Sequence, residues 1–190
     1  LVKVAMDEKR HLLVNFINEN PTVKGIVFVR TQVRADRVVA HLAKNNIKAY
    51  TIHGGMDQII REKNLSDFRD EPAGVLIATD VTARGIDLPG ISHVINYDLP
   101  DLPENYVHRI GRTGRGFAKG EAISFCSPEE LEKLKEIEDF LQSKIAEQKV
   151  NKQFLSEIEK VDDSTSISQM IAIEEALHGA GHRKTRKKKK

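Results

Sequence analysis

The chain has 190 residues, of which 39% are hydrophobic and 31% are charged, and its formal net charge is +2. This length allows one domain with a sizeable core plus extensions. Neither a signal peptide nor an apolar run near the ~20 residues that cross a bilayer is present, so we expect a cytoplasmic protein with no membrane partner.

Cysteine usage points to a reducing compartment. Cys126 is the single cysteine, so we expect no disulfide partner, and its apolar neighbours Ile123 and Phe125 predict a core thiol in a strand rather than a nucleophile. No cysteine and histidine cluster has the spacing of zinc ligands, so we predict no metal site.

Positive charge is concentrated at one end of the chain. Residues 182–190 hold seven Lys or Arg and no acid, and the other 23 basic and 28 acidic residues leave a net charge of −5. We predict a disordered basic tail over 179–190 that adds salt-dependent, sequence-independent affinity for phosphates. A merely solubilising end is the alternative. Elsewhere, contact with nucleic acid requires a local patch.

The first half of the chain alternates between strand and helix patterns. A β-branched apolar run predicts a buried strand over 24–30, and helical spacing follows over 33–43. A short strand at 49–52 and a helix over 57–69 come next.

The second half continues the alternation with strands at 75–78, 91–97 and 121–126 and a short helix at 104–110. This order predicts an α/β fold, a doubly wound parallel sheet with helices on both faces.

A further helix is expected to begin after the last strand. Ser127, Pro128 and Glu130 form a capping-box pattern at its start. The residues predicted to form its apolar stripe against the domain are Leu131, Leu134, Leu141 and Ile145. We therefore predict a domain over 1–145, a helical or partly disordered extension over 146–178, and the basic tail.

Three arginines at 109, 112 and 115 share one short stretch with glycines at 111, 114 and 116. The planar guanidinium can grip two phosphate oxygens at once. A solvated helix face is the alternative, but the three glycines would weaken a helix. The cluster therefore predicts a phosphate clamp.

Polar residues follow several of the predicted strands, where an open parallel sheet places its sites. Thr31 ends the first strand, the glycines 54 and 55 follow the second, and Thr79 follows the third. Glycine amides can approach a phosphate closely, and a threonine hydroxyl can donate to one. An ordinary turn remains the alternative for the glycines.

Other polar residues have more specific expectations. Gln58 and Arg61 lie three apart, so they share one helix face that can be offered to a nucleic-acid backbone. Asp87 can accept two ribose hydroxyl protons, or it can stabilise the following turn. Asp80 is predicted to orient a cation, either Arg84 or one of the clustered arginines.

Four ordered stretches together resemble the DEAD-box ATP-dependent RNA helicases. They are IVFVRT at 26–31, QIIR at 58–61, ATDVTARGID at 78–87 and YVHRIGRTGRG at 106–116, and the resemblance runs from residue 7 to 145. It implies the C-terminal RecA-like domain of such a helicase, and is most like bacterial members. Position 82 departs from the family, which commonly has alanine where this chain has threonine.

The resemblance also implies roles for individual residues. Arg112 and Arg115 match the arginine fingers that reach the γ-phosphate of ATP, and Gly85 and Asp87 match positions near the nucleotide. His108 matches a coupling residue, with a structural hydrogen-bond partner as the alternative. The positions implied to bind nucleic acid are Thr31, Gly54, Gln58, Arg61, Thr79, Asp80, Arg84 and Arg109.

The phosphate loop, the D-E-A-D tetrapeptide and the S-A-T motif do not occur in this sequence. In the family they belong to an N-terminal RecA-like domain that holds most of the ATP and its Mg²⁺. The resemblance therefore implies RNA and that N-terminal domain as partners, and no ATP hydrolysis by this chain alone. Two alternatives stay open: a non-catalytic RNA-binding adaptor of the same fold, and a nucleotide-cofactor enzyme of the doubly wound class.

Overall fold

A computed structural model describes residues 1–83, 85–114 and 120–149 of the chain. Its six strands form one sheet in the order β1-β6-β5-β2-β4-β3, and every pair is parallel. The strands are β1 (Val2–Lys3), β2 (Lys24–Phe28), β3 (Ala49–Ile52), β4 (Gly74–Ala78), β5 (His93–Asn96) and β6 (Glu121–Cys126). The predicted parallel sheet is confirmed.

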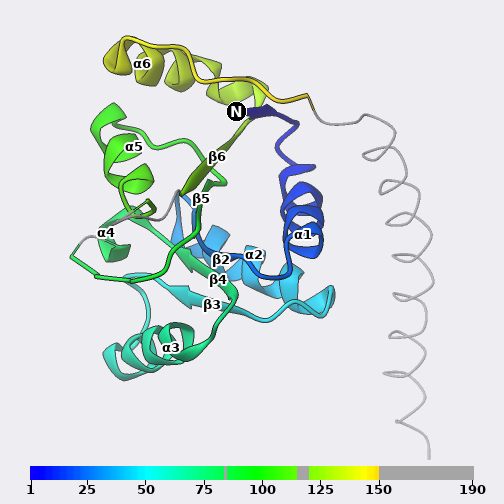
Figure 1. The fold of residues 1–190 in the computed structure, drawn as a ribbon, viewed down its shortest axis with the longest axis vertical. Helices are drawn as coiled ribbons and strands as arrows, with labels where there is room; N and C mark the ends of the chain where they lie inside the picture. The colour runs from blue at the N-terminus through cyan, green and yellow to red at the C-terminus, as the bar shows by residue number, and fades with distance from the viewer. Residues whose placement is uncertain (84, 115–119, 150–190) are drawn as a thin grey trace, which may run out of the picture. The chain divides into compact units, whose positions relative to one another are not determined.

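Helices follow the strands and cover both faces of the sheet, with α1 and α2 on one side and α3 on the other (Figure 1). They are α1 (Lys9–Glu19), α2 (Gln32–Lys44), α3 (Gln58–Asp70), α4 (Asp80–Ala83), α5 (Pro103–Ile110) and α6 (Leu131–Leu141), with a 3-10 turn at Pro128–Glu130. This is the doubly wound arrangement that the alternation of strands and helices predicted.

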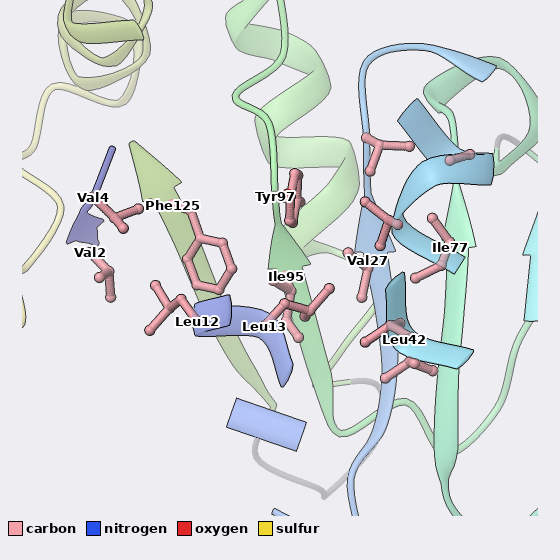
Figure 2. Packing of buried hydrophobic residues seen from close by; sticks show 14 of the residues in the cluster. Val2, Val4, Leu12, Leu13, Val27, Leu42, Ile77, Ile95, Tyr97 and Phe125 are labelled. Carbon is pink, nitrogen blue, oxygen red and sulfur yellow. The ribbon is translucent and has the colours of Figure 1, made fainter. Parts of the chain in front are cut away.

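Strand β2 and the residue after it show that the sheet is buried on both faces. Val27 and Val29 point into the core with α1 and α2, where Figure 2 shows Val27 beside Leu42. The alternate residues Ile26 and Phe28 belong to the opposite cluster, with α3. Because both faces are covered, the sequence from Ile26 to Val29 is continuously apolar and does not alternate between apolar and polar residues.

Two side chains fix the starts of helices at the carboxyl edge of the sheet. The Thr31 hydroxyl accepts a hydrogen bond from the Arg34 amide at 3.2 Å, and an Asp57 oxygen accepts from the Ile59 amide at 2.8 Å. Asp57 is thus the N-cap of α3, in the helix predicted over 57–69. Thr31 does not end a strand, because β2 stops at Phe28 and Thr31 begins the next helix instead.

The region after β6 departs from the predicted apolar stripe. The capping box of Ser127 and Glu130 is present, but its first turn is a 3-10 turn and the α-helix begins only at Leu131. Leu131 is therefore 48% exposed, whereas Leu134 and Ile137 are buried. The expectation was wrong for Leu131, because the tighter first turn shifts the buried stripe to the later residues.

A buried ion pair ties α1 to this turn. The Lys9 ammonium is fully buried, donates to the Tyr97 carbonyl at 2.8 Å and bonds the buried Glu130 carboxylate. Burial alone would raise the pKa of Glu130, but Lys9 and the amides of Ser127 and Leu99 outweigh it and hold that pKa below its usual value.

Cys126 ends β6 and is 1% exposed, so the prediction of a core thiol is confirmed. Burial is the main cause that raises the pKa of its thiol to about 11. This disfavours the reactive thiolate.

The last described residues, 146–149, lie beside the start of the chain. The Gln148 amide donates to the Leu1 carbonyl at 2.8 Å. Residues 150–190, which include most of the predicted extension and all of the basic tail, lie outside the described part.

Candidate functional site

The carboxyl edge of the sheet gathers several of the predicted site residues. Thr31 follows β2, the turn 53–56 follows β3, and Thr79 and Asp80 follow β4. Parallel strands place these loops at one edge. The structure therefore brings residues from three separate loops to one edge of the sheet.

Arg109 is the most completely bonded cation at this edge. Its guanidinium grips both carboxylate oxygens of Asp80 at 2.6 and 2.8 Å, and it donates to the Asn96 side chain at 3.1 Å and to the Asp98 carbonyl at 2.7 Å. The group also lies 4.9 Å from the centre of the Phe28 ring, and the residue is 2% exposed. Burial of such a charge is stable only with this bonding.

This geometry concerns two of the predicted contacts. Arg109 and Asp80 were predicted to contact nucleic acid, and in this structure their side chains are bonded to each other. Their contact with nucleic acid stays a prediction. Of the partners predicted for Asp80, the structure identifies Arg109, and Arg84 lies outside the described residues. The pair joins the loop after β4 to the helix α5.

Arg112 lies just beyond α5 and is half-buried. Its guanidinium donates to the Ile86 carbonyl at 3.0 Å, next to Asp87 in the chain. His108 is exposed and lines a shallow hollow between α4 and α5 with Asn105 and Arg112. Arg115, the other predicted finger, lies outside the described residues.

The loop from 85 to 87 has a glycine where its backbone takes a positive φ. Gly85 has φ +77°, a conformation that residues with a Cβ rarely adopt. Asp87 is exposed, and its carbonyl accepts a hydrogen bond from Arg69 at 3.3 Å. The carboxylate and the Arg112 cation thus come from neighbouring segments, which suits a ligand that carries both hydroxyls and phosphates.

Thr82 holds the loop after β4 in a way that sequence reasoning missed. Its hydroxyl lies 3.1 Å from the Ile52 carbonyl, 3.0 Å from the Thr79 carbonyl and 3.1 Å from the Thr79 hydroxyl. The hydroxyl therefore joins the ends of β3 and β4. Thr79 is itself 8% exposed, so only a small part of the residue faces a ligand. The departure from alanine at position 82 was the available signal.

Gln58 and Arg61 share one face of α3, as their spacing predicted. The Arg61 guanidinium bonds the Gln58 carbonyl oxygen, and the Gln58 amide donates to Glu62 at 2.5 Å. Gln58 is exposed and Arg61 is half-buried. Among the described residues, the hydrogen bonds of these two side chains are formed within their own helix.

The turn 53–56 connects β3 to α3. The Met56 amide donates to the His53 carbonyl at 3.1 Å, and the Gly55 amide lies 3.3 Å from His53 Nδ1. His53 Nε2 lies 3.1 Å from an oxygen of Asp36 on α2. His53 is 7% exposed, and Gly54 is exposed. Sequence reasoning assigned no role to His53 or Asp36.

Two structural searches of the described residues gave negative results. No group of three or more His, Cys, Asp or Glu residues in this part of the chain could hold a metal ion. None of the helices there is long and apolar enough to cross a membrane.

Comparisons with known proteins agree with the fold. The family described as "Helicase conserved C-terminal domain" matches residues 8–116. The ATP-dependent RNA helicase FAL1 of Vanderwaltozyma polyspora is 47% identical over 140 residues, which are 74% of this chain and 35% of that protein. The chain thus spans about a third of the length of this relative.

Two solved structures resemble the chain along most of its length. The E. coli DEAD-box protein SrmB, solved with the regulator of ribonuclease activity A, has a TM-score of 0.74 and 33% identity, covering 80% of this chain and 90% of that one. S. cerevisiae Dbp5 bound to RNA and ADP BeF3 has a TM-score of 0.72 and 32% identity, covering 86% and 44%.

Both yeast and bacterial proteins match, so a bacterial origin stays a prediction. The family match, the parallel sheet and the residues at its carboxyl edge agree on the family. The chain belongs to the helicase conserved C-terminal domain family, as the C-terminal RecA-like domain of a DEAD-box protein.

Proposed function

We propose that the chain is the C-terminal half of an ATP-dependent RNA helicase. In this proposal it supplies arginine fingers to ATP and half of a groove that holds the RNA backbone without reading its sequence. The main support is the buried Arg109–Asp80 pair, which locks the loop after β4 to the helix that precedes Arg112. Two ligand-facing segments are thereby held in one rigid frame.

ATP would be held on this side by Gly85, Asp87, Arg112 and Arg115. ATP supplies the phosphoryl group, and the residues of this chain supply charge and position. A guanidinium that neutralises the developing charge on the phosphoryl oxygens is worth about 10³–10⁵ in rate. The Arg112 guanidinium donates to the Ile86 carbonyl, so its side chain would have to leave this partner to reach a phosphate beside Asp87.

RNA would lie along the accessible residues of the same edge: the exposed Thr31, Gly54 and Gln58, the half-buried Arg61 and the exposed part of Thr79, with Arg84 as a further candidate. These groups offer an amide, hydroxyls and cations, which contact phosphates and sugars. The chain has no tryptophan, and only three tyrosines and seven phenylalanines. None of the residues proposed for this contact set is aromatic, so the grip is expected to be sequence-independent and salt-sensitive.

The partner of this half is an N-terminal RecA-like domain, which holds Mg²⁺ and most of the ATP. ATP and RNA then each bridge the two domains, so each favours the closed arrangement and strengthens the binding of the other. His108, exposed beside Arg112, is the proposed coupling residue between the two ligands. This chain alone is expected to be inactive as an ATPase.

RNA-stimulated ATP hydrolysis by this chain fused to a DEAD-box N-terminal domain tests the proposal. Arg112→Ala is expected to lower the rate by about 10³ while RNA binding is retained. Lys44→Ala is the control, because this exposed cation ends α2 at the opposite edge of the sheet. Equal rates for Arg112→Ala and the parent fusion would favour a non-catalytic RNA-binding adaptor instead.

A further inference from the structure

We propose that His53, oriented by Asp36, is a positioning residue that makes the turn 53–56 present the Gly54 amide to a phosphate of bound nucleic acid. This inference rests on the proposed RNA function of the same edge and deepens it. Neither residue was among the predicted site residues. The turn follows β3, an edge strand that is paired on one side only, so its end needs support from side chains.

The hydrogen bonds of the turn fix the tautomer of His53. The Gly55 amide donates to Nδ1, so this nitrogen carries no proton in the neutral ring. The proton is then on Nε2, which donates to the Asp36 carboxylate at 3.1 Å. The carboxylate therefore orients the ring, and the ring in turn holds the Gly55 amide.

Three backbone amides follow His53 in the turn, and two of them donate hydrogen bonds within it. Gly55 donates to the imidazole and Met56 to the His53 carbonyl. Among the described residues the Gly54 amide has no such partner, and Gly54 is exposed at the same edge as the Thr31 cap. The arrangement therefore leaves one amide of the turn available for an anion.

Helix α2 braces the turn with two side chains. Gln32 and Asp36 lie four residues apart, so they share one face of the helix. A Cβ built on Gly55 would lie 2.4 Å from the side-chain oxygen Oε1 of Gln32, and one built on Gly54 would lie 3.4 Å from the side-chain nitrogen Nε2 of Gln32. The Gln32 side chain thus covers the turn from the side of α2, and Asp36 holds it through His53.

The exposure of Asp36 argues for positioning rather than stability. The Asp36 side chain is 63% exposed, and a polar contact that reaches solvent in this way contributes little to the free energy of folding. Its distinct effect is to select the ring orientation in which Nδ1 faces the Gly55 amide. Removal of the pair is therefore expected to change the turn before it changes the fold.

Paired substitutions at position 53 separate the acceptor role from packing. Asn has an oxygen at the place of Nδ1 and can accept from the amide two residues on, as in an Asx-turn, whereas Leu cannot. Affinity of the full 190-residue chain for a short single-stranded RNA is measured by fluorescence anisotropy. We expect His53→Leu to weaken binding about tenfold and His53→Asn to stay within about twofold of the parent.

Control variants distinguish a loss of RNA binding from a loss of folding. His41→Leu, a partly buried histidine in the last turn of α2, is expected to bind like the parent. Asp36→Ala changes only an exposed side chain, so it should retain the thermal stability of the parent and still weaken binding. If His53→Leu does not fold, Asp36→Ala decides the same question, and equal affinity of Asp36→Ala and the parent would contradict the inference.

A spectroscopic readout tests the tautomer directly. Nitrogen-15 resonances of the His53 ring, measured at a pH where the ring is neutral, should show an unprotonated Nδ1 and a protonated Nε2, and the reverse would overturn the inference. If the parent chain binds no RNA, the proposed function fails. If it binds, but His53→Leu and Asp36→Ala bind equally well, only the positioning role fails.

Discussion

Arg109 and Arg61 lie at the same edge of the sheet but are held in opposite ways. Arg109 is 2% exposed and bonded to both oxygens of Asp80, whereas Arg61 is half-buried and bonded to Gln58 within its own helix. A cation that is fully bonded before a ligand arrives shapes the site, and a weakly held one can turn to meet the ligand. One edge thus combines rigid support with adaptable contacts.

We call the ion pairs Arg109–Asp80 and Lys9–Glu130 the buried frame, and the residues Thr31, Gly54, Gln58 and Arg61 the exposed face. The frame is expected to govern the free energy of unfolding, and the face is expected to govern affinity for RNA. Substitutions that mix the two effects would break this division.

The largest expected effect is on stability at the Lys9–Glu130 pair. Glu130→Gln leaves a fully buried ammonium without its nearest counter-charge and with only the Asp98 carboxylate at 3.9 Å, so we expect a loss of about 3 to 4 kcal/mol in the free energy of unfolding at pH 7. Urea denaturation followed by circular dichroism measures this loss. A cost below about 1 kcal/mol would show that the pair is not part of the frame.

The same pair predicts an acid limit to stability. The pKa of Glu130 is lowered in the folded state, so its stabilising effect is present above the unfolded value of about 4.3 and is lost as the pH falls through the lower, folded value. The parent should lose stability on acidification below about pH 4, and Glu130→Gln should lose less over that range. Equal acid sensitivity of the two proteins would contradict this assignment.

A somewhat smaller loss is expected at the second pair of the frame. Asp80→Ala leaves the buried Arg109 guanidinium with only its neutral partners, which should cost about 3 kcal/mol in the free energy of unfolding. Asp67→Ala is the matched control, because its 3.8 Å contact with Lys63 is exposed. The frame is refuted if both substitutions cost the same.

The smallest effect is expected on the exposed face. Arg61→Ala should weaken RNA binding about tenfold, reduce the slope of log affinity against log salt by about 1, and leave thermal stability nearly unchanged. Lys63→Ala, an exposed cation on α3, controls for the general loss of charge. An equal loss of affinity in both variants would reduce Arg61 to one of many surface charges.

Much of the fold followed from local patterns. The apolar runs of β2 and β4 and the capping box of Ser127 and Glu130 were visible because hydrophobic periodicity and capping act over a few residues. The exposure of Leu131 was not, since it depends on a 3-10 turn at Pro128 that the capping pattern alone does not distinguish from an α-helical one.

The sequence indicated which types of residue form the site, but it did not indicate which of them are buried or bonded to each other. Spacing placed Arg109 among three similar arginines, and only the packing of α5 against Phe28 and Asp80 reveals it as buried. The contacts of Asp36 with His53 and of Thr82 with the Ile52 carbonyl join segments far apart in sequence. No local pattern indicates which polar residues will meet in this way.

The division of the edge is tested most directly by titrating the full chain with a short single-stranded RNA and following nitrogen-bound protons by nuclear magnetic resonance. We predict that the resonances of the Gly54 and Gln58 amides and of the Arg61 side chain shift, while that of the Arg109 Nε proton stays unchanged. A shift of the Arg109 signal with no change at Gly54 would contradict this prediction, because the buried frame would then be the RNA contact.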